Sequence, residues 1–258
     1  SAYEGLGDYF KAERHALRAH EISRSIFGDD SVETIRSSSQ LAWLSYKLGV
    51  RKEGFSRLEE AEQKLRDLGQ IDRVTICRLA SLLNERGEIE RAEAMVNEIR
   101  DEDNEANDPV SLWSGQLLAG IYLKQGRVLE ARELLKSLAQ TESVSEEGDQ
   151  LRPQNLEAIH TLFQLEFEQG QMDRAEKLAT DGLRLANRLL DGSHRITLLL
   201  KYDLALIAEE RGESQHAQSS LESILKVQQA RLSSQHKDTL RTLLALSRNQ
   251  LRQGKARR

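Results

Sequence analysis

The sequence predicts an all-α solenoid of about six helical hairpins, each a helix, a turn and a second helix. Good helix formers dominate the composition, and only two prolines, Pro109 and Pro153, interrupt a chain of 258 residues. Glycines recur at intervals of 38 to 44 residues, as in a repeat protein that ends one helix of every unit at the same point. These observations predict repeated helical hairpins rather than a single globular core.

The composition argues against several classes of function. The formal net charge is −5, whereas general nucleic-acid binding requires a basic surface. The single cysteine, Cys77, excludes an internal disulfide and a multi-cysteine metal site, and it fits a reducing compartment. No run approaches the roughly 20 apolar residues of a membrane span. We therefore expect a cytoplasmic protein that binds neither nucleic acid nor a membrane.

A ladder of glycines anchors the repeat. The residues before the glycine are similar from one repeat to the next, as in NERG, EERG and LRQG. Glycine ends a helix readily because it adopts the left-handed conformation without a Cβ penalty. Each of these glycines therefore marks the end of the first helix of a hairpin. The ladder consists of Gly7, Gly49, Gly87, Gly126, Gly170, Gly212 and Gly254.

A side chain able to cap a helix stands fifteen residues before six of these glycines. Such a side chain accepts a hydrogen bond from an unpaired N–H of the first turn, so about 14 residues of helix are expected before each glycine. The expected caps are Thr34, Asp72, Ser111, Asn155, Thr197 and Thr239.

A small residue stands five positions after each glycine, where a second helix would run back antiparallel. Small side chains let two helices approach closely, and one hairpin buries its apolar face only by packing on the next. The small residues are Ala12, Gly54, Ala92, Ala131, Ala175 and Ala217, and a leucine stands eight positions before the glycine at Leu41, Leu79, Leu118, Leu162, Leu204 and Leu246.

These columns resemble the tetratricopeptide repeat (TPR), most clearly at Leu118-Ala119, Tyr122, Gly126 and Ala131. The usual repeat has 34 residues, whereas most repeats here have about 42, as in the kinesin-light-chain-like subclass. The junctions LDGSHRITL and LSSQHKDTL are similar to those of that subclass, with His194 and His236 in equivalent places and Ser31 there in the first junction. The proline that follows the histidine in the family is replaced by Arg195 and Lys237.

The resemblance implies a right-handed superhelical α-solenoid of helix-turn-helix repeats, spanning residues 1–258 as a single domain. It also implies a scaffold that binds a protein or peptide on the concave face, which the first helices line. Residues ten, six, three and two positions before each glycine are expected to be exposed there. The predicted peptide-binding residues are Trp43, Tyr46, Lys47, Asn84, Trp113, Lys124, His160, Gln164, Phe167, Tyr202 and Arg248.

Aromatic residues are only 5% of the chain, yet several fall on this expected face. Trp and Tyr are enriched at binding hot spots, which favours a role in binding. The alternative is that these rings fill gaps between helices. Binding could also involve the acidic segments 99–111 and 141–154, or the basic stretch Arg241–Arg258.

The sequence has no recognisable catalytic constellation. It lacks an HExxH motif, a Walker-type glycine loop and a GxSxG motif. His15 and His20 are five residues apart and do not share one helical face, and His194 and His236 are expected near helix starts. We therefore expect no enzymatic activity, no cofactor and no bound metal.

Two further expectations concern the parent protein. The chain begins and ends within hairpins, without the polar capping repeats usual in solenoids, which predicts a fragment of a longer protein with further domains. The alternative function is a C-terminal sensor or regulatory arm of a multidomain signalling NTPase of the STAND type. A Gly-x-x-x-x-Gly-Lys-Ser/Thr loop upstream would favour that alternative.

Overall fold

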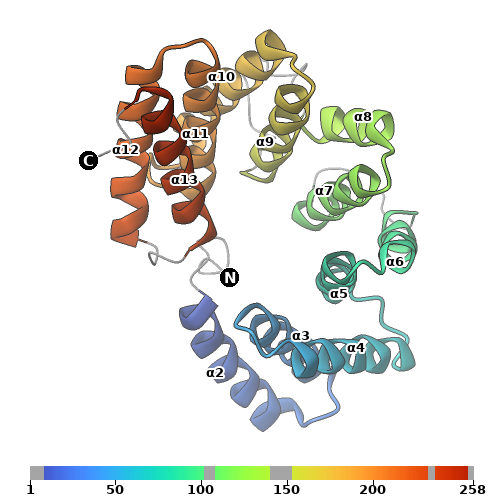
Figure 1. The fold of residues 1–258 in the computed structure, drawn as a ribbon. Coiled ribbons are helices and arrows are strands. Elements are labelled where there is room, and N and C mark those ends of the chain that lie inside the picture. Colours follow the sequence, from blue (N-terminus) through green and yellow to red (C-terminus); the bar gives the residue numbers. More distant parts are fainter. Residues whose placement is uncertain (1–8, 102–107, 140–152, 232–235, 255–258) are drawn as a thin grey trace. The chain divides into compact units, whose positions relative to one another are not determined.

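A computed structural model describes residues 9–101, 108–139, 153–231 and 236–254 of the chain. In these residues the regular structure is α-helical, which confirms the all-α prediction (Figure 1). Among them, no helix is long and apolar enough to cross a membrane. The helices are α2 (Tyr9–Phe27), α3 (Val32–Lys47), α4 (Arg51–Asp67), α5 (Arg73–Arg86), α6 (Ile89–Asp101), α7 (Pro109–Lys124), α8 (Val128–Ala139), α9 (Pro153–Glu168), α10 (Met172–Leu189), α11 (Arg195–Glu210), α12 (Ser214–Arg231) and α13 (Lys237–Arg252).

The glycine ladder ends the first helices as predicted. Every ladder glycine from Gly49 to Gly254 has a positive φ, and Gly7 lies outside the described residues. At the end of α3 the Gly49 N–H donates to the Tyr46 carbonyl at 3.1 Å, and the Val50 N–H donates to the Ser45 carbonyl at 2.9 Å. This pair of bonds is the Schellman motif, which satisfies the last carbonyls of a helix.

The predicted caps are wrong at most positions, because most first helices begin one turn earlier than expected. The observed caps are Ser31, Asp72, Asp108, His194 and His236, of which only Asp72 was predicted. The predicted caps Thr34, Ser111, Thr197 and Thr239 lie in the first turn and are buried, and Asn155 instead donates to the Leu138 carbonyl at 2.6 Å. The position fifteen residues before the glycine is thus mostly a buried small polar residue of the first turn. The capping residue lies three positions earlier, in the junction.

The two junction histidines stand at helix starts, as predicted. His194 Nδ1 accepts a hydrogen bond from the Ile196 N–H at 3.3 Å, and His236 Nδ1 accepts one from the Asp238 N–H at 3.2 Å. Both caps therefore need an imidazole whose Nδ1 carries no proton.

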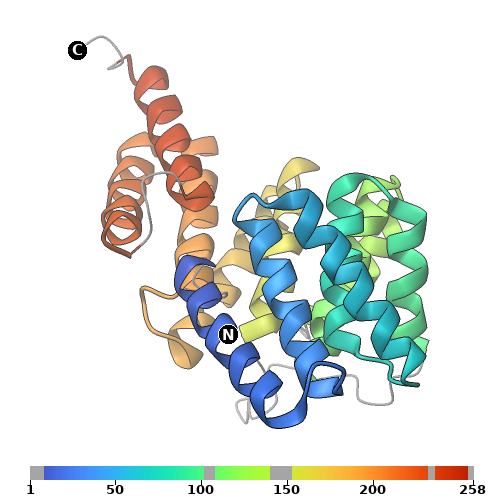
Figure 2. The same ribbon diagram turned by 90° about the horizontal axis from the view of Figure 1, so that it is seen from below.

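The small-residue column lies where the two helices of a hairpin meet, and all six of its members are buried. Gly54 on α4 is the tightest case, since a Cβ added there would lie 2.7 Å from the Ala42 carbonyl oxygen and from the Tyr46 nitrogen on α3. The helices therefore approach backbone to backbone at this point. Figure 2 shows α3 and α4, both in blue, as neighbouring helices.

The chain divides into two compact units, unit 1 at Ser1–Leu134 and unit 2 at Leu135–Arg258. In unit 1, α5 packs on both α3 and α7, so these first helices form one layer, with α4 and α6 in the other (Figure 1). In unit 2, α11 packs on α9, α10 and α12. Each unit has cores of its own, around Leu79 and Leu83 in unit 1 and around Phe163 and Leu221 in unit 2. A single continuous solenoid over residues 1–258 stays a prediction.

Candidate binding face

The residues expected to be exposed on the first helices divide into two groups. Those ten and three positions before the glycine are seven apart and lie mostly in the seam between neighbouring first helices. Ser39 is fully buried there, with its Oγ 2.9 Å from Thr75 Oγ1 on the next first helix. Tyr46 is buried in the unit 1 core, so the expectation that it is exposed is wrong. These side chains pack between neighbouring helices of unit 1 and are not free to contact a ligand.

The residues six and two positions before the glycine are four apart, and they stand above one another on a single helical face. They are half-buried or exposed in every described first helix. We call this surface the open stripe. It consists of Trp43, Lys47, Ser81, Glu85, Gly120 and Lys124 in unit 1, and of Gln164, Glu168, Leu206, Glu210, Arg248 and Arg252 in unit 2.

Trp43 is half-buried at the edge of the open stripe. Its ring meets that of Tyr9 on α2 edge to face, with 5.9 Å between centroids, and Lys47 Nζ lies 5.6 Å from its centroid. Its Nε1 is buried and meets no acceptor among the described residues. Trp43 thus combines a packing role with a partly accessible ring beside a cation, which is an arrangement found at binding hot spots.

The predicted ligand-binding cations bind neighbouring repeats. Lys47 forms an ion pair with Glu85 on the next first helix. Lys124 Nζ donates to the Asn84 carbonyl at 2.6 Å. Arg248 Nη2 lies 2.9 Å from Oε2 of the buried Glu209. A ligand anion would have to compete with these contacts, so charge alone is a weak source of affinity on this face.

The remaining predicted aromatics are half-buried between helices. Trp113 packs against Ile76 and Cys77, and Phe167 stacks on Phe163 with 5.5 Å between centroids. Tyr202 packs beside Leu221, and burial raises the pKa of its phenol. All three contribute to packing, and their role in peptide binding stays a prediction.

His160 is buried, and the expectation that it is exposed is wrong. Its Nδ1 lies 2.6 Å from Asp203 Oδ2 on α11, and Asp203 is 1% exposed. Burial raises the pKa of Asp203, and the hydrogen bond from His160 opposes that shift. The pair joins neighbouring first helices of unit 2. Gln164, one turn along α9, is half-buried on the open stripe.

Two other polar groups of unit 1 lie in its seam. The side-chain Oδ1 of Asn84 is buried and meets no donor among the described residues. The backbone carbonyl of Asn84 accepts the hydrogen bond from Lys124 Nζ. Cys77 is fully buried, and burial raises the pKa of its thiol to about 12. A thiol of that acidity is protonated at neutral pH and does not act as a nucleophile.

Within the described ranges, no group of three or more His, Cys, Asp or Glu side chains is placed to hold a metal ion. Residues 102–107 of the acidic segment 99–111, residues 141–152 of the acidic segment 141–154 and the basic end 255–258 lie outside the described residues.

No family model matches the chain, and no curated protein matches its sequence. Solved structures do match. A Podosopora anserina protein of nearly identical TPR-like repeats, named as a kinesin light chain, has a TM-score of 0.56 at 22% identity, covering 77% of this chain and 96% of that one. This chain has the TPR-like helical-repeat fold. The predicted resemblance is thereby confirmed.

Two bacterial proteins share the fold. BtubC (BKLC) from P. vanneervenii has a TM-score of 0.56 at 19% identity, covering 87% of this chain and 84% of that one. The quorum sensor NprR from B. thuringiensis, in its apo form, has a TM-score of 0.67 at 15% identity, covering 97% of this chain and 70% of that one. NprR is also known in complex with its cognate peptide NprX.

Sequence reasoning missed a cavity in unit 1, among α2, α3 and α4, whose lining does not include the open stripe. A signal for it was present in the repeat alignment. Arg24 and Arg66 occupy equivalent positions 42 residues apart, but Asp29, five residues after Arg24, is matched by Ile71 after Arg66. The two arginines therefore have different partners within reach.

Proposed function

We propose that this chain is a cytoplasmic, non-catalytic scaffold module that binds a protein or peptide along the open stripe of its first helices. The observation that carries the proposal is the division of the first-helix surface. From α3 to α11 the seam positions are buried or half-buried, while every described first helix leaves its open-stripe pair half-buried or exposed. Within each unit, a row of such positions repeated from helix to helix suits an extended or helical peptide.

The peptide complex of NprR supports this proposal by analogy of fold. The chemistry of the stripe supports it more directly. Trp43 offers an aromatic surface, and the stripe carries both signs of charge in each unit, at Lys47 and Glu85 in unit 1 and at Glu210 and Arg252 in unit 2. Such a pattern favours partners with both charges and an apolar anchor over strongly acidic or strongly basic ones.

Gly120 on α7 provides a test, because a Cβ added there meets nothing within 4 Å and would stand in the open stripe. Peptides would first be selected by display against the wild-type chain. We expect the substitution Gly120→Trp to keep the fold. Because the new ring blocks the site, the affinity for the selected peptides should fall by at least about tenfold. Fluorescence polarisation measures the affinity, and circular dichroism checks the fold.

The matched control is Ser56→Trp, which places the same ring at an exposed position on α4, a second helix. This control is expected to leave affinity unchanged. Peptides that bind the Gly120→Trp chain as tightly as the wild type would contradict binding along the open stripe. The sensor arm of a signalling NTPase stays an alternative prediction, which the upstream gene sequence tests.

A further inference from the structure

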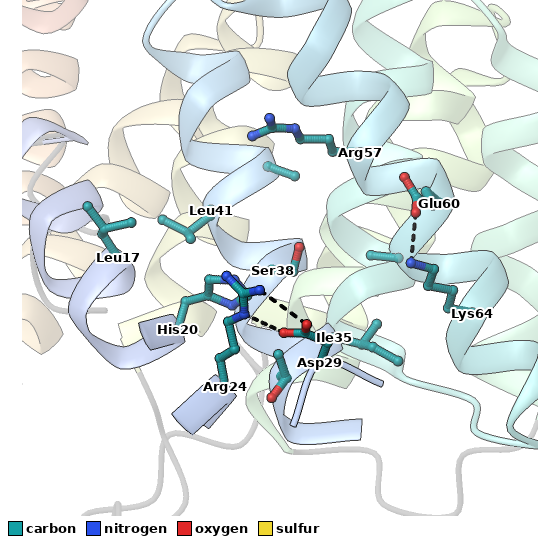
Figure 3. A pocket seen from close by; sticks show the side chains of 13 residues that line it. Leu17, His20, Arg24, Asp29, Ile35, Ser38, Leu41, Arg57, Glu60 and Lys64 are labelled. Carbon is teal, nitrogen blue, oxygen red and sulfur yellow. Dashed lines mark hydrogen bonds and ion pairs between the residues drawn. The ribbon is translucent and has the colours of Figure 1, made fainter. Parts of the chain in front are cut away.

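A cavity of about 390 Å³ lies among α2, α3 and α4 in unit 1 (Figure 3). Its α3 residues include Ile35, Ser38 and Leu41, none of which belongs to the open stripe. The cavity is therefore separate from the proposed binding face. We call it the α2–α4 slot. Its volume lies at the lower end of the range for ligand sites, roughly 300–1,000 Å³.

The base of the slot is apolar. Ile35, Ala42 and Ala61 line it and are buried. Leu17 projects from α2 and is 48% exposed, and Leu41 is half-buried. The equivalent of Leu41 in the next repeat, Leu79, is only 1% exposed. Apolar side chains that neighbouring repeats cover are therefore left accessible in this slot.

The rim of the slot is charged. Arg24 pairs with Asp29, and Lys64 Nζ lies 2.8 Å from Glu60 Oε1, as the dashed lines in Figure 3 show. Arg57 lines the slot from α4, and its ion-pair partner is Glu53 of the same helix, which does not line the slot. Both members of that pair are more than half exposed, so the pair is weak. Among the residues that line the slot, three cations face two carboxylates, an excess of one positive charge.

The next slot along unit 1, between α4 and α6, is bridged. Arg66 binds Glu98 with two hydrogen bonds of 2.6 and 2.7 Å, and Arg91 on α6 reaches Glu59 on α4 at 2.8 Å. Arg24 and Glu60 are the repeat equivalents of Arg66 and Glu98. They do not bridge α2 and α4, because each is held by a local partner.

The local partner of Arg24 explains the difference. Asp29 stands in the turn after α2 and receives both Arg24 Nε and Nη2. At the equivalent place after α4 the chain has Ile71, which offers no carboxylate, so Arg66 pairs through Nε with Glu62 of its own helix and keeps both Nη atoms for Glu98. Asp29 thus binds Arg24, and Lys64 binds Glu60. Because Arg24 and Glu60 do not pair with each other, the α2–α4 slot stays open.

We propose that the α2–α4 slot binds an acidic segment of a protein partner, placing a Glu or Asp carboxylate on Arg57 and an adjacent apolar side chain over Leu17 and Leu41. The rim is open to solvent, so a free small molecule would remain largely hydrated there, whereas a peptide adds contacts on either side of its anchor. The remaining positive charge sets the sign of the ligand. This proposal does not depend on binding at the open stripe.

The probe is a fluorescein-labelled peptide, Leu-Glu-Ile-Glu-Leu, titrated with the wild-type chain at low salt by fluorescence polarisation. The comparison peptide is Leu-Lys-Ile-Lys-Leu. We expect saturable binding of the acidic peptide only. Arg57→Glu should weaken it by at least about tenfold, and Ser38→Trp, which fills the slot without changing charge, should weaken it similarly.

Lys52→Glu is the matched control, since it reverses a charge on α4 outside the slot and should change affinity less than about twofold. Failure of the acidic peptide to saturate at millimolar concentration would overturn the proposal. Equal affinity of the Arg57→Glu and wild-type chains would also overturn it. Circular dichroism of each variant checks that the fold is intact.

The substitution Asp29→Ile distinguishes binding of the peptide in the slot from attraction by the overall charge of the chain. It copies the next repeat and releases Arg24 to bridge to Glu60, so we expect the slot to close and the acidic peptide to bind several-fold more weakly. Bulk charge alone predicts the opposite, because a carboxylate has been removed. Tighter or unchanged binding would show that the open slot does not hold the peptide, and would overturn the proposal.

Discussion

Unit 1 and unit 2 build the same hairpin with different polar chemistry. The first helices of unit 1 begin at Ser31, Asp72 and Asp108, whereas two first helices of unit 2 begin at His194 and His236. A capping oxygen and an unprotonated imidazole nitrogen both accept a backbone N–H. One backbone geometry therefore tolerates caps that differ in how they respond to pH.

The pKa values of two caps show this difference. Burial works to raise the pKa of Asp108, but hydrogen bonds from Ser111, from the Val110 N–H and from Arg73 outweigh it, and the pKa falls to about 2. Its stabilising effect is full above its ordinary pKa of 3.8 and is lost only as the pH falls toward 2. Asp108 therefore remains a charged cap throughout the physiological range.

His236 responds at higher pH. Burial lowers its pKa from the ordinary 6.5, and Asp238 only partly opposes this. Below pH 6.5 the unfolded chain gains a proton that the folded cap resists, so stability is full above that pH and declines as the pH falls. Protonation also removes the acceptor that receives the Asp238 N–H. Unit 2 should therefore lose stability in mild acid before unit 1 does.

The largest expected effect concerns the buried pair of unit 2. His160→Ala leaves the Asp203 carboxyl buried without its imidazole, and we expect unit 2 to lose about 3–5 kcal/mol of unfolding free energy. In unit 1, Ser39→Ala removes only a neutral hydroxyl contact to Thr75 and should cost about 1 kcal/mol. Hydrogen exchange of the α9 and α5 amides in the full chain measures the two losses.

The double substitution His160→Leu with Asp203→Leu is the control, because replacing both partners by apolar groups removes the desolvation cost. It should recover most of the stability. A loss below about 1 kcal/mol in His160→Ala would show that the pair does not hold α9 against α11.

A smaller difference is expected between two buried glycines. Gly54→Ala in unit 1 drives a Cβ into the backbone of α3, and should cost about 1–3 kcal/mol. Gly182→Ala in unit 2 meets side-chain rather than backbone atoms, Ile159 Cγ2 at 2.9 Å and Leu200 Cδ2 at 3.0 Å, so its strain should be smaller. The helix-propensity gain of alanine, about 1 kcal/mol, should offset that strain. Urea denaturation of both variants compares them, and equal losses would contradict the difference in contacts.

The smallest effect is the pH dependence of the caps. Asp108→Ala should cost about 1 kcal/mol at both pH 7.5 and pH 5, since its carboxylate stays charged. His236→Ala should cost a similar amount at pH 7.5 but little at pH 5, where the wild-type cap is itself weakened by protonation. Hydrogen exchange of α7 and α13 at the two pH values measures this. A cost for His236→Ala that does not change with pH would contradict a titrating cap.

Much of the fold could be predicted from sequence because its determinants are local. The glycines and the junction histidines act within a few residues of their own position, the small-residue column acts within one hairpin, and each was placed correctly. The helix starts were missed by one turn at Ser31 and Asp108, since a capping residue and a buried small polar residue look alike in sequence. The exposure of Tyr46 and His160 was also missed, because it depends on the next repeat.

The repeat register, and with it the TPR-like hairpin, was determined by the sequence alone, because glycine readily adopts the positive φ that ends a first helix and a small side chain lets the second helix approach it. The tertiary structure decided which of the predicted face residues lie in the seam and which lie on the open stripe. It also decided that Arg66 bridges to Glu98 while Arg24 turns back to Asp29. The physical reason is the distance in space between each guanidinium and the carboxylates around it. An ion pair forms with whichever carboxylate the fold brings nearest, and spacing in the chain does not reveal which one that is.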